Sequence, residues 1–238
     1  MFILKVKVVV FDLDDTLYNE IEFVYSGFNA VSKYFSNKYN INKVEFFDNM
    51  VEILNKFGRG QVFDLVLKKF YIYNKINLKK SISIYRLHSP KINLPDESIE
   101  TLKYIKNNNI PIYIVTDGNK IVQSKKIEAL KVEKYVNKVY ITHRYGLKYS
   151  KPSTYCFKKI LELEKCSYNE VVYIGDNVNK DFINIKKLGF RTIRIINGMF
   201  KNVIKKEEYH AEIDINNILD VKNILKLKHN IKEKEWKK

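Results

Sequence analysis

The sequence predicts an α/β fold in which a parallel sheet carries helices on both faces and an all-helical segment follows the first strand. Three observations support this prediction. Residues 6–11 form a continuous apolar run, which is typical of a strand buried on both faces. Residues 18–85 show helical periodicity and no convincing strand. From about residue 99 onward, strand patterns alternate with helical ones, as in chains that build parallel sheets.

The inserted segment is expected to contain amphipathic helices, because its apolar residues recur at intervals of three and four. They fall into three successive groups: Ile21, Val24, Phe28, Val31 and Phe35; Val44, Phe47, Val51 and Leu54; and Val62, Leu65, Val66 and Phe70. The stretch LHSPKINLPDES, with prolines at positions 90 and 95, ends the segment. Asp96 is a favourable N-cap for the helix that follows.

The rest of the chain alternates between helices and strands. Four more strands are expected, at residues 110–116, 138–142, 171–175 and 191–196. Before the first of them, Ile99, Leu102 and Ile105 share a helical face. Further helices are expected at residues 120–130, 153–163 and 178–188, the last closed by Gly189.

Composition and charge limit the classes of function that this chain can have. The 238 residues include 43 Lys and Arg against 27 Asp and Glu, a formal charge of +16. Such a charge can indicate nucleic-acid binding, but the basic residues are scattered apart from the tail at 222–238. No apolar run reaches the length of a membrane span, and a signal peptide is not expected. Cys156 and Cys166 are expected to be reduced packing residues, in keeping with a cytoplasmic protein.

Polar residues follow the strands directly, where parallel sheets place their ligand sites. Asp12, Asp14 and Thr16 follow the first strand, Thr116, Asp117 and Gly118 the second, Lys151 lies after the third, and Asp176 and Asp181 follow the fourth. Clustered carboxylates repel one another unless a cation lies between them. Oxygen ligands suit a hard cation, and Mg²⁺ is the usual one where substrate phosphates complete its coordination.

The ordered motifs DLDDT, TDG, KP and GDNVNKD resemble those of the haloacid dehalogenase superfamily of phosphohydrolases, over residues 6–198. This resemblance implies a three-layer Rossmann-like core with a parallel sheet, formed by residues 1–17 and 86–238. Residues 18–85 are similar to the family's helical cap of the first type. Residues 85–130 further resemble the branch that contains pyrimidine-nucleotidase-like phosphatases.

The resemblance also implies a role for each motif residue. Asp12 is the expected nucleophile, which forms an aspartyl-phosphate, and Asp14 the general acid and base. Asp12, Asp14 (through its backbone carbonyl) and Asp176 are the expected ligands of Mg²⁺. The expected phosphate-binding residues are Thr116, Asp117, Gly118 and Lys151, with Asp117 contributing through its backbone. Lys151 also belongs to the expected catalytic set. Asp181 is expected either to hold a metal-bound water or to orient Lys151, and Asn177 either to orient Asp176 or the metal-bound waters or to cap the next helix.

The resulting hypothesis is a cytoplasmic, Mg²⁺-dependent phosphatase of a small phosphomonoester, such as a nucleotide or a sugar phosphate. Asp14 supports phosphoryl transfer, since the family's dehalogenases lack an acid at that position. A phosphomutase of the same superfamily is one alternative, and a basic nucleic-acid-binding or partner-binding protein on this scaffold is another. Asp15 is expected to face solvent or to bond within its loop. The substrate and the oligomeric state stay open.

Overall fold

The computed structural model describes residues 6–225; residues 1–5 and most of the basic tail, 226–238, lie outside the described residues. The chain forms two compact units. We call the first the core unit; it comprises the chain up to Tyr18, Leu94–Gly118 and the chain from Val132 onward. We call the second the helical unit; it comprises Asn19–Asn93 and Asn119–Lys131.

The sequence-based division assigned residues 18–85 to the helical part and left residues 86–93 and 120–130 in the core, although both segments belong to the helical unit. The helical unit instead also contains α6 (Lys120–Leu130), which packs against α4 (Lys75–Leu87). A buried lysine of α6, Lys126, pairs with Glu20 of this unit at 2.8 Å. Periodicity does not reveal such a pairing, because the two residues lie about a hundred positions apart in the chain.

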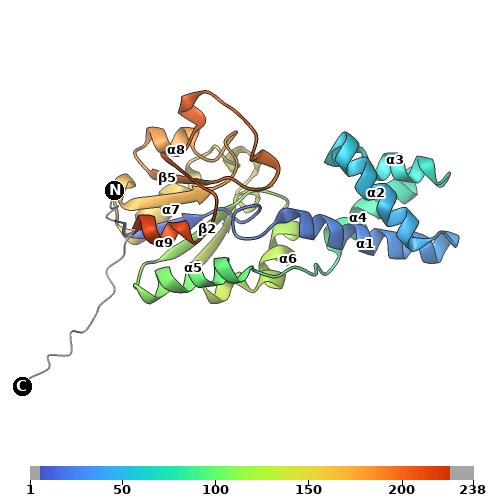
Figure 1. Ribbon diagram of the computed structural model, residues 1–238, viewed down its shortest axis with the longest axis horizontal. Helices are drawn as coiled ribbons and strands as arrows, with labels where there is room; N and C mark the ends of the chain where they lie inside the picture. The colour runs from blue at the N-terminus through green and yellow to red at the C-terminus, as the bar shows by residue number, and fades with distance from the viewer. Residues whose placement is uncertain (1–5, 226–238) are drawn as a thin grey trace, which may run out of the picture. The chain divides into compact units, whose positions relative to one another are not determined.

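The core unit is built on a six-stranded parallel sheet in the order β3-β2-β1-β4-β5-β6 (Figure 1). In chain order the strands are β1 (Val8–Phe11), β2 (Ile112–Thr116), β3 (Lys138–Ile141), β4 (Val171–Gly175), β5 (Arg191–Ile195) and β6 (Ile213–Ile215). β1 lies between β2 and β4, and Phe11 is in register with Ile114 and Ile174. The carboxyl ends of these three strands therefore meet at one edge of the sheet.

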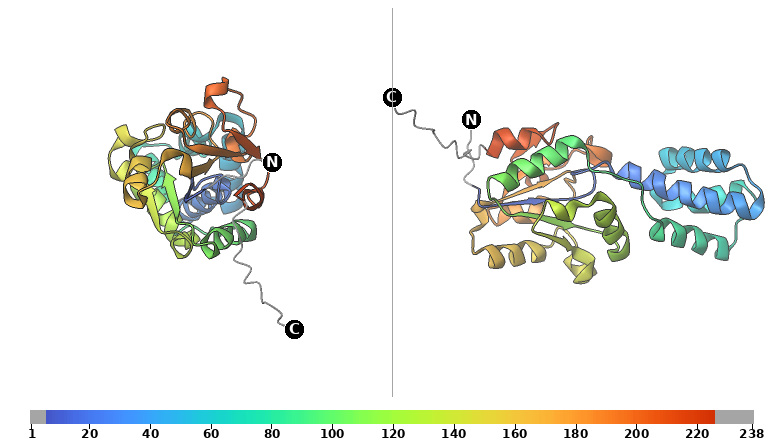
Figure 2. Two further views of the ribbon diagram at one scale, coloured as in Figure 1. Left: turned by 90° about the vertical axis from the view of Figure 1, so that its left-hand side faces the viewer. Right: turned by 90° about the horizontal axis from the view of Figure 1, so that it is seen from below.

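Helices cover both faces of this sheet, which confirms the predicted α/β architecture. α5 (Asp96–Asn107) and α9 (Asp220–Leu225) lie on one face, and α7 (Tyr155–Glu164) lies on the other (Figure 2, right). α8 (Ile183–Lys187) is shorter than the expected helix at 178–188, because residues 176–181 form a loop at the end of β4. No helix within residues 6–225 has the length and apolar character needed to cross a bilayer.

Burial explains which strands the sequence predicts. Every residue of β1, β2 and β4 is buried, so these strands appear in the sequence as unbroken apolar runs. The aromatic side chains of the buried cluster between this sheet and its helices are Tyr113, Tyr140, Phe157, Tyr173, Phe182 and Phe190. β6 was not predicted, because it has only three residues, IDI, of which the first is half-buried, the second exposed and the third buried, at the edge of the sheet.

The helical unit contains α1 (Glu20–Tyr39), α2 (Lys43–Phe57), α3 (Val62–Lys69), α4 and α6. Val24, Phe28, Val31 and Phe35 of α1 are buried as expected, whereas Ile21 of the same expected face is 36% exposed. The expected buried face of α2 was wrong in part: Val44 is 66% exposed, and Phe46, Met50, Ile53 and Leu54 are the buried residues. Both sets satisfy helical spacing, so only packing against α1 and α3 distinguishes them. Asn42 begins α2 by accepting hydrogen bonds from the amides of Val44 and Glu45.

Candidate active site

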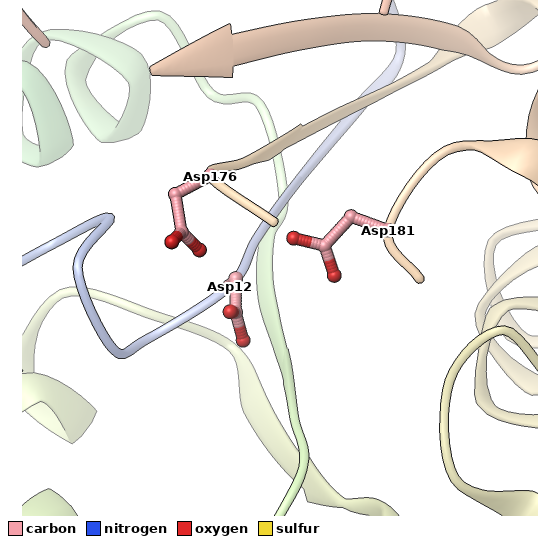
Figure 3. A group of neighbouring side chains, drawn as sticks. All are labelled: Asp12, Asp176 and Asp181. Carbon is pink, nitrogen blue, oxygen red and sulfur yellow. The ribbon is translucent and has the colours of Figure 1, made fainter. Parts of the chain in front are cut away.

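Three carboxylates meet at the carboxyl edge of the core sheet. Asp12 follows β1, while Asp176 and Asp181 come from the loop that follows β4 (Figure 3). One oxygen from each carboxylate lies within 4.8 Å of the other two, and all three residues are at most 5% exposed. β1 and β4 are adjacent strands, so the sheet itself brings these residues together.

Lys151 is the cation among these carboxylates. Its Nζ lies 2.9 Å from Asp12 Oδ1 and 2.8 Å from Asp181 Oδ1, and its side chain is 1% exposed. It also donates a hydrogen bond of 2.9 Å to the hydroxyl of Tyr173, a residue of β4. Burial would lower the pKa of Lys151, but the charges of Asp12 and Asp181 outweigh burial and hold it above its usual value. Lys151 therefore stays protonated and fixed in place.

The charges of the three carboxylates are not balanced by Lys151. Burial raises the pKa of Asp12 to about 7, although Lys151 pulls it down. Burial, together with the charges of Asp181 and Asp12, raises the pKa of Asp176 to about 9. Asp12 Oδ1 lies 2.9 Å from Lys151 Nζ, and it accepts no further hydrogen bond from the described residues. These carboxylate oxygens are buried and close together, and one lysine does not neutralise their charge. Such a group of oxygens fits a divalent cation such as Mg²⁺.

Asp14 differs from the three buried carboxylates. It is half-buried, and its Oδ1 accepts a hydrogen bond of 2.7 Å from the hydroxyl of Tyr18. Its carboxylate is thus held at the same strand end while it keeps contact with solvent. A group in that position can exchange protons with a substrate or with water, which the fully buried Asp181 cannot do.

The residues expected to bind phosphate lie at the end of the neighbouring strand. Thr116 is the last residue of β2 and is 1% exposed. Gly118 follows with a φ of 139°, a conformation that side-chain-bearing residues rarely adopt. β2 is hydrogen-bonded to β1, so these residues lie beside the strand that carries Asp12.

Asn177 acts inside the loop that follows β4. Its side chain accepts a hydrogen bond from the amide of Asn179 at 3.0 Å, so it stabilises the local turn. Its own backbone amide donates to Asp181 Oδ2 at 2.9 Å. Gly175 is needed beside it, since a Cβ there would lie 2.6 Å from Asp181 Oδ2. The loop therefore fixes the carboxylate that holds Lys151.

Sequence reasoning missed the side chain of Asp117, which was expected to contribute through its backbone. Its Oδ1 accepts hydrogen bonds from Thr142 Oγ1 at 2.6 Å and from the backbone amide of Lys151 at 3.1 Å. Its Oδ2 lies 3.0 Å from Nζ of Lys180. Burial opposes ionisation of Asp117, but the two lysines and these hydrogen bonds hold its pKa below the usual value. Nothing in the local sequence TDG identifies these distant partners.

The expectation that Asp15 faces solvent was wrong, whereas its alternative role within a loop is correct. Asp15 is 6% exposed and has a φ of 52°. Its Oδ2 accepts a long hydrogen bond of 3.4 Å from the amide of Met199. A Cβ on Gly198 would collide with the Asp15 carboxylate, so the two loops are in close contact.

Sequence reasoning also missed the hydrogen bond that the Tyr173 hydroxyl accepts from Lys151. In the sequence Tyr173 appears only as a strand residue.

Comparisons with known proteins identify the family of this chain. A family model for haloacid dehalogenase-like hydrolases matches residues 9–195. A glyceraldehyde 3-phosphate phosphatase of Methanocaldococcus jannaschii is 31% identical, over 90% of this chain and 94% of its own. A protein with the same name from Pyrococcus furiosus is 25% identical, over 90% of each chain.

Solved structures show the same fold at lower identity. A haloacid dehalogenase-superfamily phosphatase from Thermococcus onnurineus superposes with a TM-score of 0.59 at 22% identity, over 93% of this chain and 99% of its own. A putative beta-phosphoglucomutase from Thermotoga maritima gives a TM-score of 0.65 at 16% identity, over 92% and 98%. With its family model, its curated relatives and its fold in agreement, this chain belongs to the haloacid dehalogenase-like hydrolases.

Proposed function

We propose that this phosphatase releases phosphate from a short phosphorylated carbohydrate, with glyceraldehyde 3-phosphate as the first substrate to test. One observation carries the chemistry: the buried group of Asp12, Asp176 and Asp181, with Lys151 between Asp12 and Asp181. The substrate class comes from the relatives, which are named glyceraldehyde 3-phosphate phosphatases. We also propose that the enzyme works in the cytoplasm, in keeping with its two free cysteines.

Asp12 is the proposed nucleophile. Its carboxylate oxygen attacks the phosphorus, the bond to the ester oxygen breaks, and an aspartyl-phosphate forms. Asp14 gives a proton to the departing oxygen, which leaves as an alcohol. Asp14 then takes a proton from water, and this water releases inorganic phosphate and restores Asp12. The hydrogen bond from Tyr18 orients Asp14 for both transfers.

Asp12, Asp176 and the backbone carbonyl of Asp14 are the proposed ligands of Mg²⁺. When bound, this cation supplies positive charge to the phosphoryl oxygens as negative charge builds up there. Thr116, Gly118 and the backbone of Asp117 are proposed to hold the remaining phosphate oxygens. Lys151 offsets the charge of Asp12, and Asp181 with the amide of Asn177 keeps Lys151 in place.

The proposal is tested by measuring phosphate release from a panel of substrates. The panel contains glyceraldehyde 3-phosphate, longer sugar phosphates and nucleoside monophosphates, each with MgCl₂ and with EDTA, and Asp12→Asn is the control variant. We expect Mg²⁺-dependent turnover that the variant lacks and that is fastest with the short substrate. Faster turnover of a nucleotide would overturn the substrate assignment. The absence of turnover with every substrate would overturn the function.

A further inference from the structure

An ion pair crosses the end of the strand that carries the proposed nucleophile. Asp117 comes from the loop after β2 and Lys180 from the loop after β4, and Asp117 Oδ2 lies 3.0 Å from Lys180 Nζ. β1 lies between β2 and β4 in the sheet. To meet each other, the two side chains must therefore span the carboxyl end of β1, where Asp12 is located. Lys180 lies within the motif GDNVNKD, but the family resemblance assigned it no role.

Asp117 is the fixed member of this pair. Its side chain is 10% exposed, and its other oxygen is already held by Thr142 and by the backbone amide of Lys151. Lys180 differs, because its side chain is 30% exposed and Asp117 is its one ion-pair partner among the described residues. Lysine side chains keep their charged ends toward water, so at this exposure the Lys180 ammonium group is accessible to a ligand.

Lys151 does not have this freedom. Its side chain is 1% exposed, and its Nζ lies 2.8–2.9 Å from oxygens of Asp12, Asp181 and Tyr173. A lysine ammonium has three hydrogens to donate, and three partners already surround this one. A substrate phosphate dianion adds negative charge where three carboxylates already face one buried lysine. Asp117, which pairs with Lys180, also accepts a hydrogen bond from the backbone amide of Lys151, so both lysines lie beside the same carboxylate.

We propose that Lys180 is a further substrate-binding residue, which the Asp117 carboxylate holds across the end of β1 and which contacts the phosphoryl group of the bound phosphomonoester. This inference rests on the proposed function. In the free enzyme Lys180 pairs with Asp117, and on binding it donates to a phosphate oxygen. The site thus has two lysines with different roles. Lys151 is buried and pairs with the proposed nucleophile Asp12, and Lys180 is accessible and binds the substrate phosphate.

The test compares Lys180→Met and Lys180→Arg with the wild type. The matched control is Lys187→Met, which removes the same charge from a lysine that is 61% exposed and pairs with Glu208 at 3.7 Å. The readouts are KM, kcat and the competitive inhibition constant of inorganic phosphate. A hydrogen bond to a charged group contributes enough that its loss weakens binding by about 10- to 100-fold.

We expect Lys180→Met to raise KM and the phosphate inhibition constant by about tenfold or more, with a smaller change in kcat. Lys180→Arg should retain most of the affinity, and Lys187→Met should equal the wild type. A phosphate constant that is unchanged in Lys180→Met would overturn the inference, even if kcat fell. Lys180→Gln serves the same comparison if the Met variant does not fold.

A double variant separates substrate binding from a role in neutralising Asp117. If Lys180 only balanced the charge of Asp117, then Asp117→Asn combined with Lys180→Met would recover the wild-type phosphate constant, and the inference would be overturned. We expect the double variant to bind phosphate as weakly as Lys180→Met. Calorimetric titration with inorganic phosphate and Mg²⁺ measures phosphate binding directly, so it decides between these outcomes without any turnover. If phosphate binds as expected but no substrate is hydrolysed, the proposed function fails and the inference about Lys180 stands.

Discussion

Replacing Asp176 with asparagine should stabilise the metal-free protein, although it should abolish activity. Burial and the neighbouring carboxylates raise the pKa of Asp176 from 3.8 to about 9, so the folded protein holds a proton that the unfolded chain releases at neutral pH. The free energy of unfolding therefore falls as the pH rises above 3.8 and continues to fall until the pH passes about 9. The asparagine side chain carries no ionisable group, so the free energy of unfolding of the variant would not fall with pH for this reason.

The size of the effect follows from the pH interval. One pH unit corresponds to about 1.4 kcal/mol, so the interval from the usual aspartate pKa to about pH 7.5 amounts to roughly 5 kcal/mol. We expect the free energy of unfolding of the variant to be higher by about 2–5 kcal/mol. The lower values apply if the buried asparagine amide does not find all its hydrogen-bond partners. For a chain of this length each kcal/mol raises Tm by about 2–4 °C, so the increase should reach roughly 4–20 °C.

Thermal unfolding followed by circular dichroism measures this change, in EDTA and in MgCl₂, from about pH 4 to about pH 8. In EDTA the variant should have the higher Tm near neutral pH, and the difference should vanish toward pH 4. In MgCl₂ the wild type should gain stability, by about 2.7 kcal/mol at a hundredfold excess over Kd, while the variant gains little. A variant that is less stable in EDTA at neutral pH would refute the charge argument, and equal stabilisation of both proteins by Mg²⁺ would refute the ligand assignment.

Asp12→Asn should lower phosphate release by at least about a thousandfold while the circular dichroism spectrum stays unchanged; retained turnover in a continuous phosphate assay would exclude Asp12 as the nucleophile. Lys151→Met should destabilise the protein by about 3–5 kcal/mol in urea titration, because Asp12 and Asp181 would lose their buried cation; a loss below about 1 kcal/mol would contradict this reasoning. Gly175→Ala should lower phosphate release in the continuous phosphate assay, because the added methyl would lie 2.6 Å from Asp181 Oδ2 and displace the carboxylate that holds Lys151; unchanged turnover would show that the loop adjusts without moving the site.

The local sequence was sufficient to predict the central sheet. β1, β2 and β4 are buried on both faces, and an element with that environment must be apolar along its whole length. Polar residues that follow such runs necessarily lie at the carboxyl edge of a parallel sheet. The grouping of Asp12 with Asp176 follows from this rule, and the structure brings them together as expected.

The tertiary structure decided the features that depend on distant partners. Periodicity alone placed Val44 on the buried face of α2, while packing selected Phe46 and Met50. The hydrogen bonds of Asp117 reach residues 25 and 34 positions away, and its ion pair reaches Lys180, 63 positions away.

The sequence by itself therefore determined the fold class and which residues lie at the strand ends. A strand that is buried on both faces must be apolar along its length, and the polar residue after it shows where the strand ends. Only the tertiary structure decided which of those residues touch. Contacts such as the pairing of Lys180 with Asp117 across the end of β1 depend on strand order and loop path, and no local pattern encodes either of these.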